Sequence, residues 1–488
     1  MHIFFLFLPI IISLLVLIKT KKSFISLFSG FFISILLQPN LTFFNFIFKG
    51  YKSISSIFYI NNSFNKWNIS ILIFLPMLSI LSTLMEESGG INSFSNWIKT
   101  KLKTKKSAEL FIIFLGIIIY IDGYFNSIIV GNISKTLSES YSISKAKIAY
   151  YVDSTSAPIC PLIPISSWGA SILGIISSLL LHSKFKDVNP LNLFLTFIPY
   201  QFFTFSVLGV LFLVALFNFN IFKMKNYEKH LLENNIDKSK INKNTSKNLQ
   251  EINPFIFLSG ILSLFLLTIL FSIINLSNLA LNMTYSVTLS ALIYFFIVRK
   301  YIDFSEFKKN LKINLINTFK SIFTLILAWA MINSIQTLGF NHEITTFLKA
   351  NNISSSIFPI LIFVFSMFIS FSSGTSWGTF YLLIPIAFSI GEVYGLHEIS
   401  IFIGATISGS VFGDNCSLIS DTTIISALTC NCKLDAHYST QIPYALIAGG
   451  ISLLMWIILF ISSSLFFSYF MLIISLSIIQ LFFNKNSD

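Results

Sequence analysis

Long apolar segments alternate with short polar connections along the whole chain. A helix needs about 20 mostly apolar residues to cross the hydrocarbon core of a bilayer, and most of these segments are long enough. Several are longer, which indicates broken helices or helical hairpins. The pattern predicts an all-α, polytopic membrane protein with about ten to fourteen transmembrane segments. They lie near residues 1–18, 22–37, 68–85, 108–137, 148–181, 191–222, 252–275, 280–298, 313–337, 354–372, 376–391, 398–428, 441–465 and 467–483.

Two of the apolar regions contain a concentrated polar segment. The first polar segment, residues 151–167, reads YVDSTSAPICPLIPISS, and the second, residues 409–427, reads GSVFGDNCSLISDTTIISA. Pro158, Pro161 and Pro164 should interrupt a helix in the first, because proline removes a backbone donor and clashes with the preceding turn. Freed carbonyls and carboxylates are tolerated at membrane depth where they are buried in protein or line a wet cavity. We interpret the two polar segments as halves of one ion site.

One long polar stretch, residues 223–251, cuts the chain into two near-equal halves. Its Lys and Asn content predicts a solvated cytoplasmic linker, and 99–106 and 299–312 are further basic connections. The positive-inside rule places all three on the cytoplasmic side. The helix at 68–85 then runs inward and the helix at 313–337 runs outward, so helices at matching places in the two halves point in opposite directions.

This arrangement predicts two inverted-topology repeats with broken helices that meet at the membrane midplane, which is a transporter architecture. A shift of 256 residues superposes Cys160 on Cys416, and a second register, Asp153 on Asp421, is nearly as good. The predicted domains are a first membrane repeat (1–222), the linker (223–251), a second membrane repeat (252–466), and an extra C-terminal helix and tail (467–488).

Composition excludes several classes of protein. Charged residues make up 11% of the chain and hydrophobic residues 54%, whereas a soluble globular domain has about 25% charged residues. The net charge of +12 comes largely from lysines clustered in connections, so we expect no nucleic-acid partner. The expected partners are membrane lipid and a transported small cation or metabolite, and composition leaves monomer and homodimer both open. No cofactor is expected beyond the transported Na⁺ and H⁺.

Four carboxylates lie outside the lysine-rich connections: Asp122, Asp153, Asp414 and Asp421. Desolvation disfavours a charged carboxylate at membrane depth, so each must be protonated, paired or bound to a cation. The alternative is a structural hydrogen bond between helices, which suits Asp122 equally well. Carboxylates, hydroxyls and backbone carbonyls suit small hard cations. A carboxylate that holds either a proton or a metal cation, but not both, is a simple basis for cation/proton exchange.

The expected site is built on these side chains. We expect Na⁺ to bind at Asp414 and Asp421, and Asp153 to complete or gate the site. Neutral oxygens would come from five hydroxyl side chains, and three further residues are secondary candidates. The hydroxyl residues are Ser154, Thr155, Ser417, Thr422 and Thr423, and the secondary candidates are Asp122, Ser376 and Asn415.

A further stretch, residues 371–380, reads FSSGTSWGTF and predicts a helix break that faces the site. It also contains G-x-S-x-G centred on Ser376, the pattern of a hydrolase nucleophile, which needs a preceding strand and a histidine base. All six histidines fall at predicted helix ends or loops, so an intramembrane serine hydrolase is a distant alternative. We interpret Glu86 and Glu87 as a solvated helix end.

Four motifs together resemble the NhaC-type sodium/proton antiporter family, within the ion transporter superfamily. They are VDSTSAPI (152–159), SGTSWGTF (373–380), GDNCSLISDTT (413–423) and TQIPYA (440–445). The resemblance covers roughly residues 70–465. Two positions depart from the usual pattern of the family: Asn415 stands where a histidine is usual, and Leu418 where a proline is usual.

The resemblance implies a secondary antiporter of the bacterial inner membrane that exchanges Na⁺ for H⁺ by alternating access, with Asp153, Asp414 and Asp421 as ion-site residues. The departure at Asn415 would alter pH sensing. Relatives also exchange organic acids such as malate and lactate, or carry amino acids, so an ion-coupled carrier of a small organic acid or amino acid is the alternative. The motifs contain no arginine to pair with a substrate carboxylate, which favours a bare cation.

Overall fold

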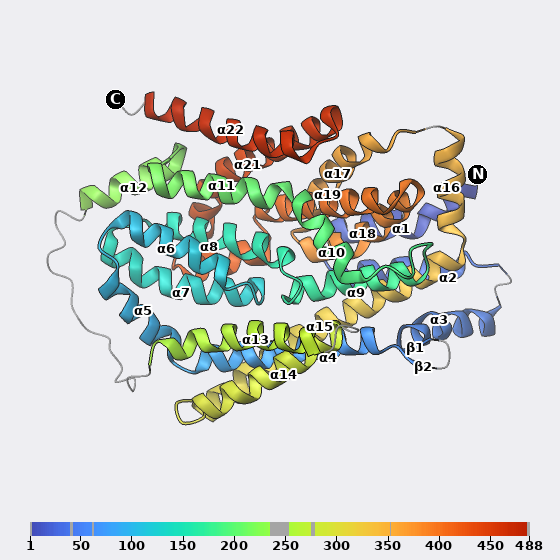
Figure 1. The fold of residues 1–488 in the computed structure, drawn as a ribbon, viewed down its shortest axis with the longest axis horizontal. Coiled ribbons are helices and arrows are strands. Elements are labelled where there is room, and N and C mark those ends of the chain that lie inside the picture. The colour runs from blue at the N-terminus through green and yellow to red at the C-terminus, as the bar shows by residue number, and fades with distance from the viewer. Residues whose placement is uncertain are drawn as a thin grey trace.

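The computed structural model describes residues 2–39, 42–60, 63–234, 253–274, 279–351 and 353–485. These residues are almost entirely helical, which confirms the predicted fold class. Ten helical segments are long and apolar enough to cross a membrane, and three shorter apolar helices accompany them in the described part of the chain. Most helices run along the long axis of the molecule (Figure 1).

The N-terminal elements lie together at one end of the molecule (Figure 1). They are α1 (His2–Thr20), α2 (Ser23–Leu36), α3 (Phe43–Phe58) and a small hairpin of β1 (Tyr59–Ile60) and β2 (Ser63–Phe64). The two strands pair antiparallel, with Tyr59 opposite Phe64. From here α4 (Lys66–Glu87) runs back along the molecule to α5 (Gly90–Lys101).

Two groups of four helices with the same pattern of breaks form the centre of the molecule. The first group is α6 (Lys105–Ile118), α7 (Gly123–Tyr141), α8 (Lys145–Ile159), the 3₁₀ turn η1 (Cys160–Leu162) and α9 (Ser167–Leu181). The second is α17 (Phe358–Ser373), α18 (Ser376–Tyr394), α19 (Leu396–Asn415) and α20 (Asp421–Thr429). The long segments predicted at 108–137, 148–181 and 398–428 are therefore each broken. Whether the two groups are inverted repeats stays a prediction.

The remaining helices flank this centre. On one side lie α13 (Phe255–Ile274), α14 (Leu279–Val298) and α15 (Phe304–Thr337), beside α4 (Figure 1). The others are α10 (Pro190–Phe197), η2 (Ile198–Tyr200), α11 (Phe202–Phe217), α12 (Phe222–Asn234), α16 (Phe340–Ala350), η3 (Ser355–Ile357), α21 (Leu434–Ser462) and α22 (Leu465–Lys485).

The structure differs from the predicted linker at its beginning, because residues 223–234 form part of helix α12 and are not an extended connection. Glu228 of this helix accepts hydrogen bonds from Lys105 (2.5 Å) and from the backbone N–H of Ser144 (2.7 Å). These contacts hold α12 against the first turns of α6 and α8. Residues 235–251 of the predicted linker lie outside the described residues.

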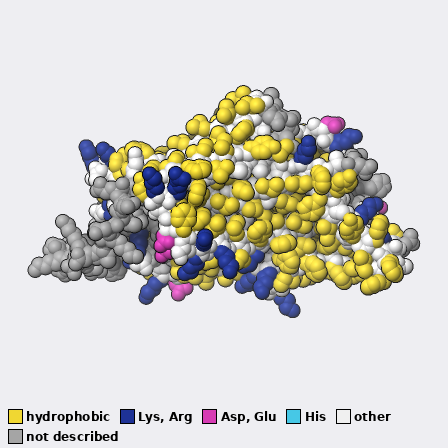
Figure 2. Space-filling model, turned by 90° about the horizontal axis from the view of Figure 1, so that it is seen from below, with side chains coloured by type: hydrophobic (Ala, Val, Ile, Leu, Met, Phe, Trp, Pro, Cys, Tyr) yellow, Lys and Arg dark blue, Asp and Glu magenta, His cyan; other side chains and the backbone are white. Residues whose placement is uncertain are grey.

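The surface fits a lipid environment. The face on the side of α13, α14 and α15 is covered by apolar side chains across its middle, with Lys and Arg near the margins (Figure 2). Leu262, Phe265 and Leu266 of α13 and Phe296 of α14 are among the exposed side chains. Since exposed apolar patches this broad are rare on soluble monomers, the protein is a multi-pass membrane protein.

Candidate functional site

Helix breaks in the first group place two helix N-termini side by side. Asp122 caps α7, because its carboxylate accepts from the backbone N–H groups of Tyr124 (2.8 Å) and Phe125 (3.3 Å). The same carboxylate accepts from the hydroxyl of Ser167 at the start of α9 (2.5 Å). Asp122 therefore ties the beginning of α7 to the beginning of α9.

The proline-rich break between α8 and α9 does free carbonyl oxygens, but other side chains bond to them. The carbonyl of Pro161 accepts from Gln201 (3.0 Å), and that of Pro158 accepts from Thr204 (3.2 Å). The hydroxyl of Ser166 donates to the carbonyl of Cys160 (2.6 Å). These oxygens therefore serve to fix the break.

The second group repeats the arrangement. Gly374 ends α17 with a left-handed φ of 68°, and Thr375 caps α18. Residues 416–420 separate α19 from α20, whose first residue is Asp421. The two groups meet where α7 and α20 begin. Gly123 is the first residue of α7, and a Cβ atom added to it would lie 3.7 Å from Thr422 of α20 and 3.6 Å from Trp168 of α9.

Asp153 of α8 is fully buried at this junction. Its Oδ2 accepts hydrogen bonds from Thr423 of α20 (2.9 Å) and from Gln441 of α21 (2.6 Å), and it lies 3.4 Å from Nε2 of His437. Its Oδ1 has no hydrogen-bond partner among the described residues. A carboxylate from the first half is thus surrounded by three side chains from the second.

Asp414, near the end of α19, is also buried. Its carboxyl group interacts electrostatically with the hydroxyls of Ser420 and Ser376 and with the carboxylates of Asp153 and Asp421. Asp414 therefore lies within electrostatic range of both Asp153 and Asp421.

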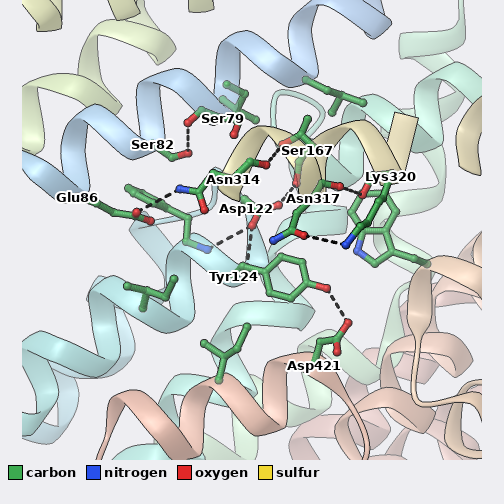
Figure 3. A pocket seen from close by; sticks show the side chains of 18 of the residues that line it. Ser79, Ser82, Glu86, Asp122, Tyr124, Ser167, Asn314, Asn317, Lys320 and Asp421 are labelled. Atoms are coloured by element: carbon green, nitrogen blue, oxygen red, sulfur yellow. Dashed lines mark hydrogen bonds between the residues drawn. The ribbon is translucent and has the colours of Figure 1, made fainter. Parts of the chain in front are cut away.

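Asp421 differs from the other two because it is exposed to a cavity of about 560 Å³. The hydroxyl of Tyr124 donates to its Oδ2 (2.8 Å; Figure 3). Asp122 and Glu86 line the same cavity. Glu86 lies at the end of α4, as predicted, and there it lines this cavity and accepts from Asn314 (3.5 Å).

The predicted neutral oxygens have varied surroundings. Thr423 alone is hydrogen-bonded to one of the three aspartates, since Thr155 donates to the carbonyl of Tyr151 and Ser417 to that of Phe371. Thr422 pairs with the hydroxyl of Ser420 (3.0 Å). Ser154 is buried, and its hydroxyl has no partner among the described residues.

Asn415 is buried beside this group, and neither of its amide atoms has a partner among the described residues. Its backbone carbonyl accepts from Gln441 (2.8 Å). With Oδ1 of Asp153, the hydroxyl of Ser154 and Oε1 of Gln441, it forms a set of buried oxygens without hydrogen-bond partners. Such oxygens can coordinate a small hard cation.

Ser376 begins helix α18, and its hydroxyl donates to the carbonyl of Ser410 (3.2 Å). The segment before it is helix α17, whereas a hydrolase nucleophile elbow requires a strand there. His437, the buried histidine of this region, contacts Asp153. The geometry therefore gives the hydrolase alternative no support.

Sequence reasoning missed four side chains of this region: Tyr124, Lys320, His437 and Gln441. Gln441 lies within the TQIPYA motif, which was a usable signal. His437 was assigned to a helix end, and it does lie in the first turn of α21, but fully buried. Lys320 could have been found as a lone lysine within a long apolar stretch.

The model of the Na⁺/H⁺ antiporter family matches residues 159–461. The chain belongs to the Na⁺/H⁺ antiporter family. This membership makes it a secondary transporter, while the NhaC subtype stays a prediction.

The family membership agrees with likenesses to three further proteins. A protein of Haemophilus influenzae that carries no functional description is 28% identical over 463 residues, which cover 90% of this chain and 87% of that protein. The crystal structure of the Alcanivorax borkumensis YdaH transporter superposes with a TM-score of 0.57 at 12% identity, over 87% of this chain and 89% of that one. MtrF of Neisseria gonorrhoeae, which represents a class of antimetabolite efflux pumps, gives a TM-score of 0.50 at 14% identity, over 86% and 83%. The two solved structures show a shared transporter fold.

Proposed function

We propose that this antiporter-family protein exchanges Na⁺ for H⁺ across the bacterial inner membrane by alternating access. The observation that supports this most is the pair of buried carboxylates, Asp153 and Asp414: Asp153 is surrounded by a hydroxyl, an amide and the imidazole of His437, and Asp414 by serine hydroxyls. An isolated ionised carboxylate in a low-dielectric interior costs several kcal/mol or more. Each must therefore be neutralised by a proton or by a cation, and the two compete for the same oxygens.

The proposed roles differ from the sequence expectation in one respect. Asp414 holds the cation together with Asp153, because both are buried, whereas Asp421 stands on the access route. Asp421 faces the cavity and interacts electrostatically with Asp414, so it can attract cations toward the buried pair. Thr423, Gln441 and Asn415 supply the surrounding neutral groups.

Proteoliposomes that contain a pH-sensitive dye test the proposal. A pulse of sodium chloride should drive proton movement in the wild-type protein without any added organic solute. Asp414→Asn should abolish this movement, because the amide cannot exchange a proton for a cation. Asp435→Asn removes an exposed carboxylate from the first turn of α21 and serves as the control, with activity retained. Full sodium-driven proton movement in the Asp414→Asn protein would refute the proposed mechanism.

A further inference from the structure

The cavity at Asp421 is larger than an ion needs, and its two walls differ in kind. One wall consists of one face each of α4 and α15, with Ser79, Ser82 and Glu86 on α4 and Asn314 and Asn317 on α15. The other wall is made by the first residues of four helices, α7, α9, α18 and α20. A volume of about 560 Å³ is within the range of small-molecule sites.

Lys320 is the cationic side chain of this cavity, and it lies about halfway along α15 within a candidate membrane span. Its Nζ donates to Oδ1 of Asn317 over 3.4 Å, a long hydrogen bond that leaves further donors of the ammonium group for a ligand (Figure 3). An ionisable residue inside a membrane span is costly to keep unless it contributes to a site. Lys320 supplies the positive charge that the sequence motifs lack.

The helix termini add to the positive side of the cavity. Early residues of α7, α9, α18 and α20 line it, and each helix N-terminus carries a partial positive charge. Side chains already accept N–H groups at three of these termini: Asp122 at α7, Ser166 at α9 and Thr375 at α18. The start of α20 has no such side-chain cap. Lys320 and this terminus favour a carboxylate group on the ligand.

The same cavity also carries negative charge. Glu86 has one long hydrogen bond, from Asn314, and Asp421 has one from Tyr124. Asn314 precedes Lys320 by six residues, which is about 9 Å along a helix. Glu86 and Lys320 therefore lie at separate places in the cavity (Figure 3). With Asp122, three carboxylates line the cavity and would repel a purely anionic solute, whereas a zwitterion satisfies both signs.

We propose that this cavity binds an amino-acid-like zwitterion, with its carboxylate at Lys320 and Asn317 and its ammonium group on the side of Glu86 and Asp421. Trp377, Ile424 and Ile425 provide an apolar wall for the rest of the solute. The inference deepens the proposed function and rests on it, since the solute would bind on the access route that Asp421 provides to the buried pair.

Thermal unfolding of the purified protein in detergent, followed by intrinsic fluorescence in sodium chloride, tests the inference. The probes are an equimolar mixture of the twenty L-amino acids and a mixture of acetate, lactate and malate. The amino-acid mixture should raise the midpoint by about 2 °C or more, because a ligand that binds only the folded state stabilises it. Lys320→Met and Glu86→Gln should each lose this rise. Lys309→Met, at an exposed position on the same helix, should keep it.

Two results would overturn the inference. No rise with the amino-acid mixture would show that the cavity takes no such solute, and an equal rise with the carboxylate mixture would show that the ammonium group is not recognised. Both readings are taken on the wild-type protein, so they do not depend on how well a variant folds. The proteoliposome assay, in which sodium chloride drives proton movement without amino acids, does not depend on these two thermal-unfolding results. If no proton movement occurs there, the proposed exchange is refuted even if amino acids stabilise the protein.

Discussion

At the scale of single residues, the surroundings of Asp153 explain why a carboxylate can be kept in the interior. Thr423 and Gln441 donate to one of its oxygens and leave the other without a partner among the described residues. A carboxylate held by neutral donors keeps the capacity to take a proton or a cation, whereas a lysine or arginine partner would remove it.

The sequence could point to Asp153 because a carboxylate between apolar residues is conspicuous. It could not pair Asp153 with Gln441, 288 residues away, because that contact depends on how α8 and α21 pack.

The hydroxyl of Thr423 should contribute to ion affinity. Thr423→Val keeps the shape of the side chain and removes the donor to Asp153. A hydrogen bond to a charged group is worth about 1.5–3 kcal/mol, so the apparent affinity for Na⁺ should change about tenfold or more. The sodium dependence of proton movement in proteoliposomes measures this change. Thr429→Val is the matched control on the same helix, since its hydroxyl donates to the carbonyl groups of Ser127 and Ile425. Equal affinities in the two variants would remove Thr423 from the site.

At the scale of elements, α19 is positioned by close contact with α17. Gly409 and Gly413 are four residues apart on α19, and a Cβ on either would lie closer than 3.0 Å to the backbone of α17. Small residues at this spacing let membrane helices approach each other, and here they set the position of Asp414. Segment lengths predicted that several of the longer segments would be broken, and 108–137, 148–181 and 398–428 are. The positions of the breaks depend on caps such as Asp122 and on bonds to the freed carbonyls, which only the packed structure shows.

Gly413→Ala should force α17 and α19 apart. Overpacking of this kind costs about 1–3 kcal/mol, so the thermal unfolding midpoint in detergent should fall, together with transport activity. Gly450→Ala on α21 is the control, because a Cβ there meets nothing within 4 Å. If both variants unfold at the wild-type temperature, α17 and α19 do not pack as closely as described.

At the scale of the whole molecule, the cavity lies between α4 and α15 on one side and the two groups of broken helices on the other. The α5 region, α12 and the α14–α15 connection, which carry the basic residues, lie at the same end of the molecule (Figure 1). Glu86 and Glu87 of α4 contact Asn314 and Asn310 near the start of α15, so the two helices run in opposite directions. Charge distribution in the sequence was sufficient to predict these directions. It could not predict the cavity, which results from the packing of distant helices.

This arrangement predicts the orientation of the protein in the membrane. In a Cys432→Ser background, a cysteine introduced at Lys309 should react with a membrane-impermeant maleimide only from the cytoplasmic side. A cysteine at the exposed Ser354 should react only from outside, because the connection between α16 and α17 lies at the other end of the molecule (Figure 1). The remaining native cysteines, Cys160, Cys416 and Cys430, are buried and should react slowly. The reverse labelling pattern would contradict a cytoplasmic location for the basic connections.

The most direct test of the central claim is whether Na⁺ binding displaces protons from the purified protein. Sodium chloride added to the detergent-solubilised protein in weakly buffered solution should release protons, and choline chloride should not. Asp153→Asn combined with Asp414→Asn should remove the release. Sodium binding without proton release, or an undiminished release in the double variant, would contradict the account.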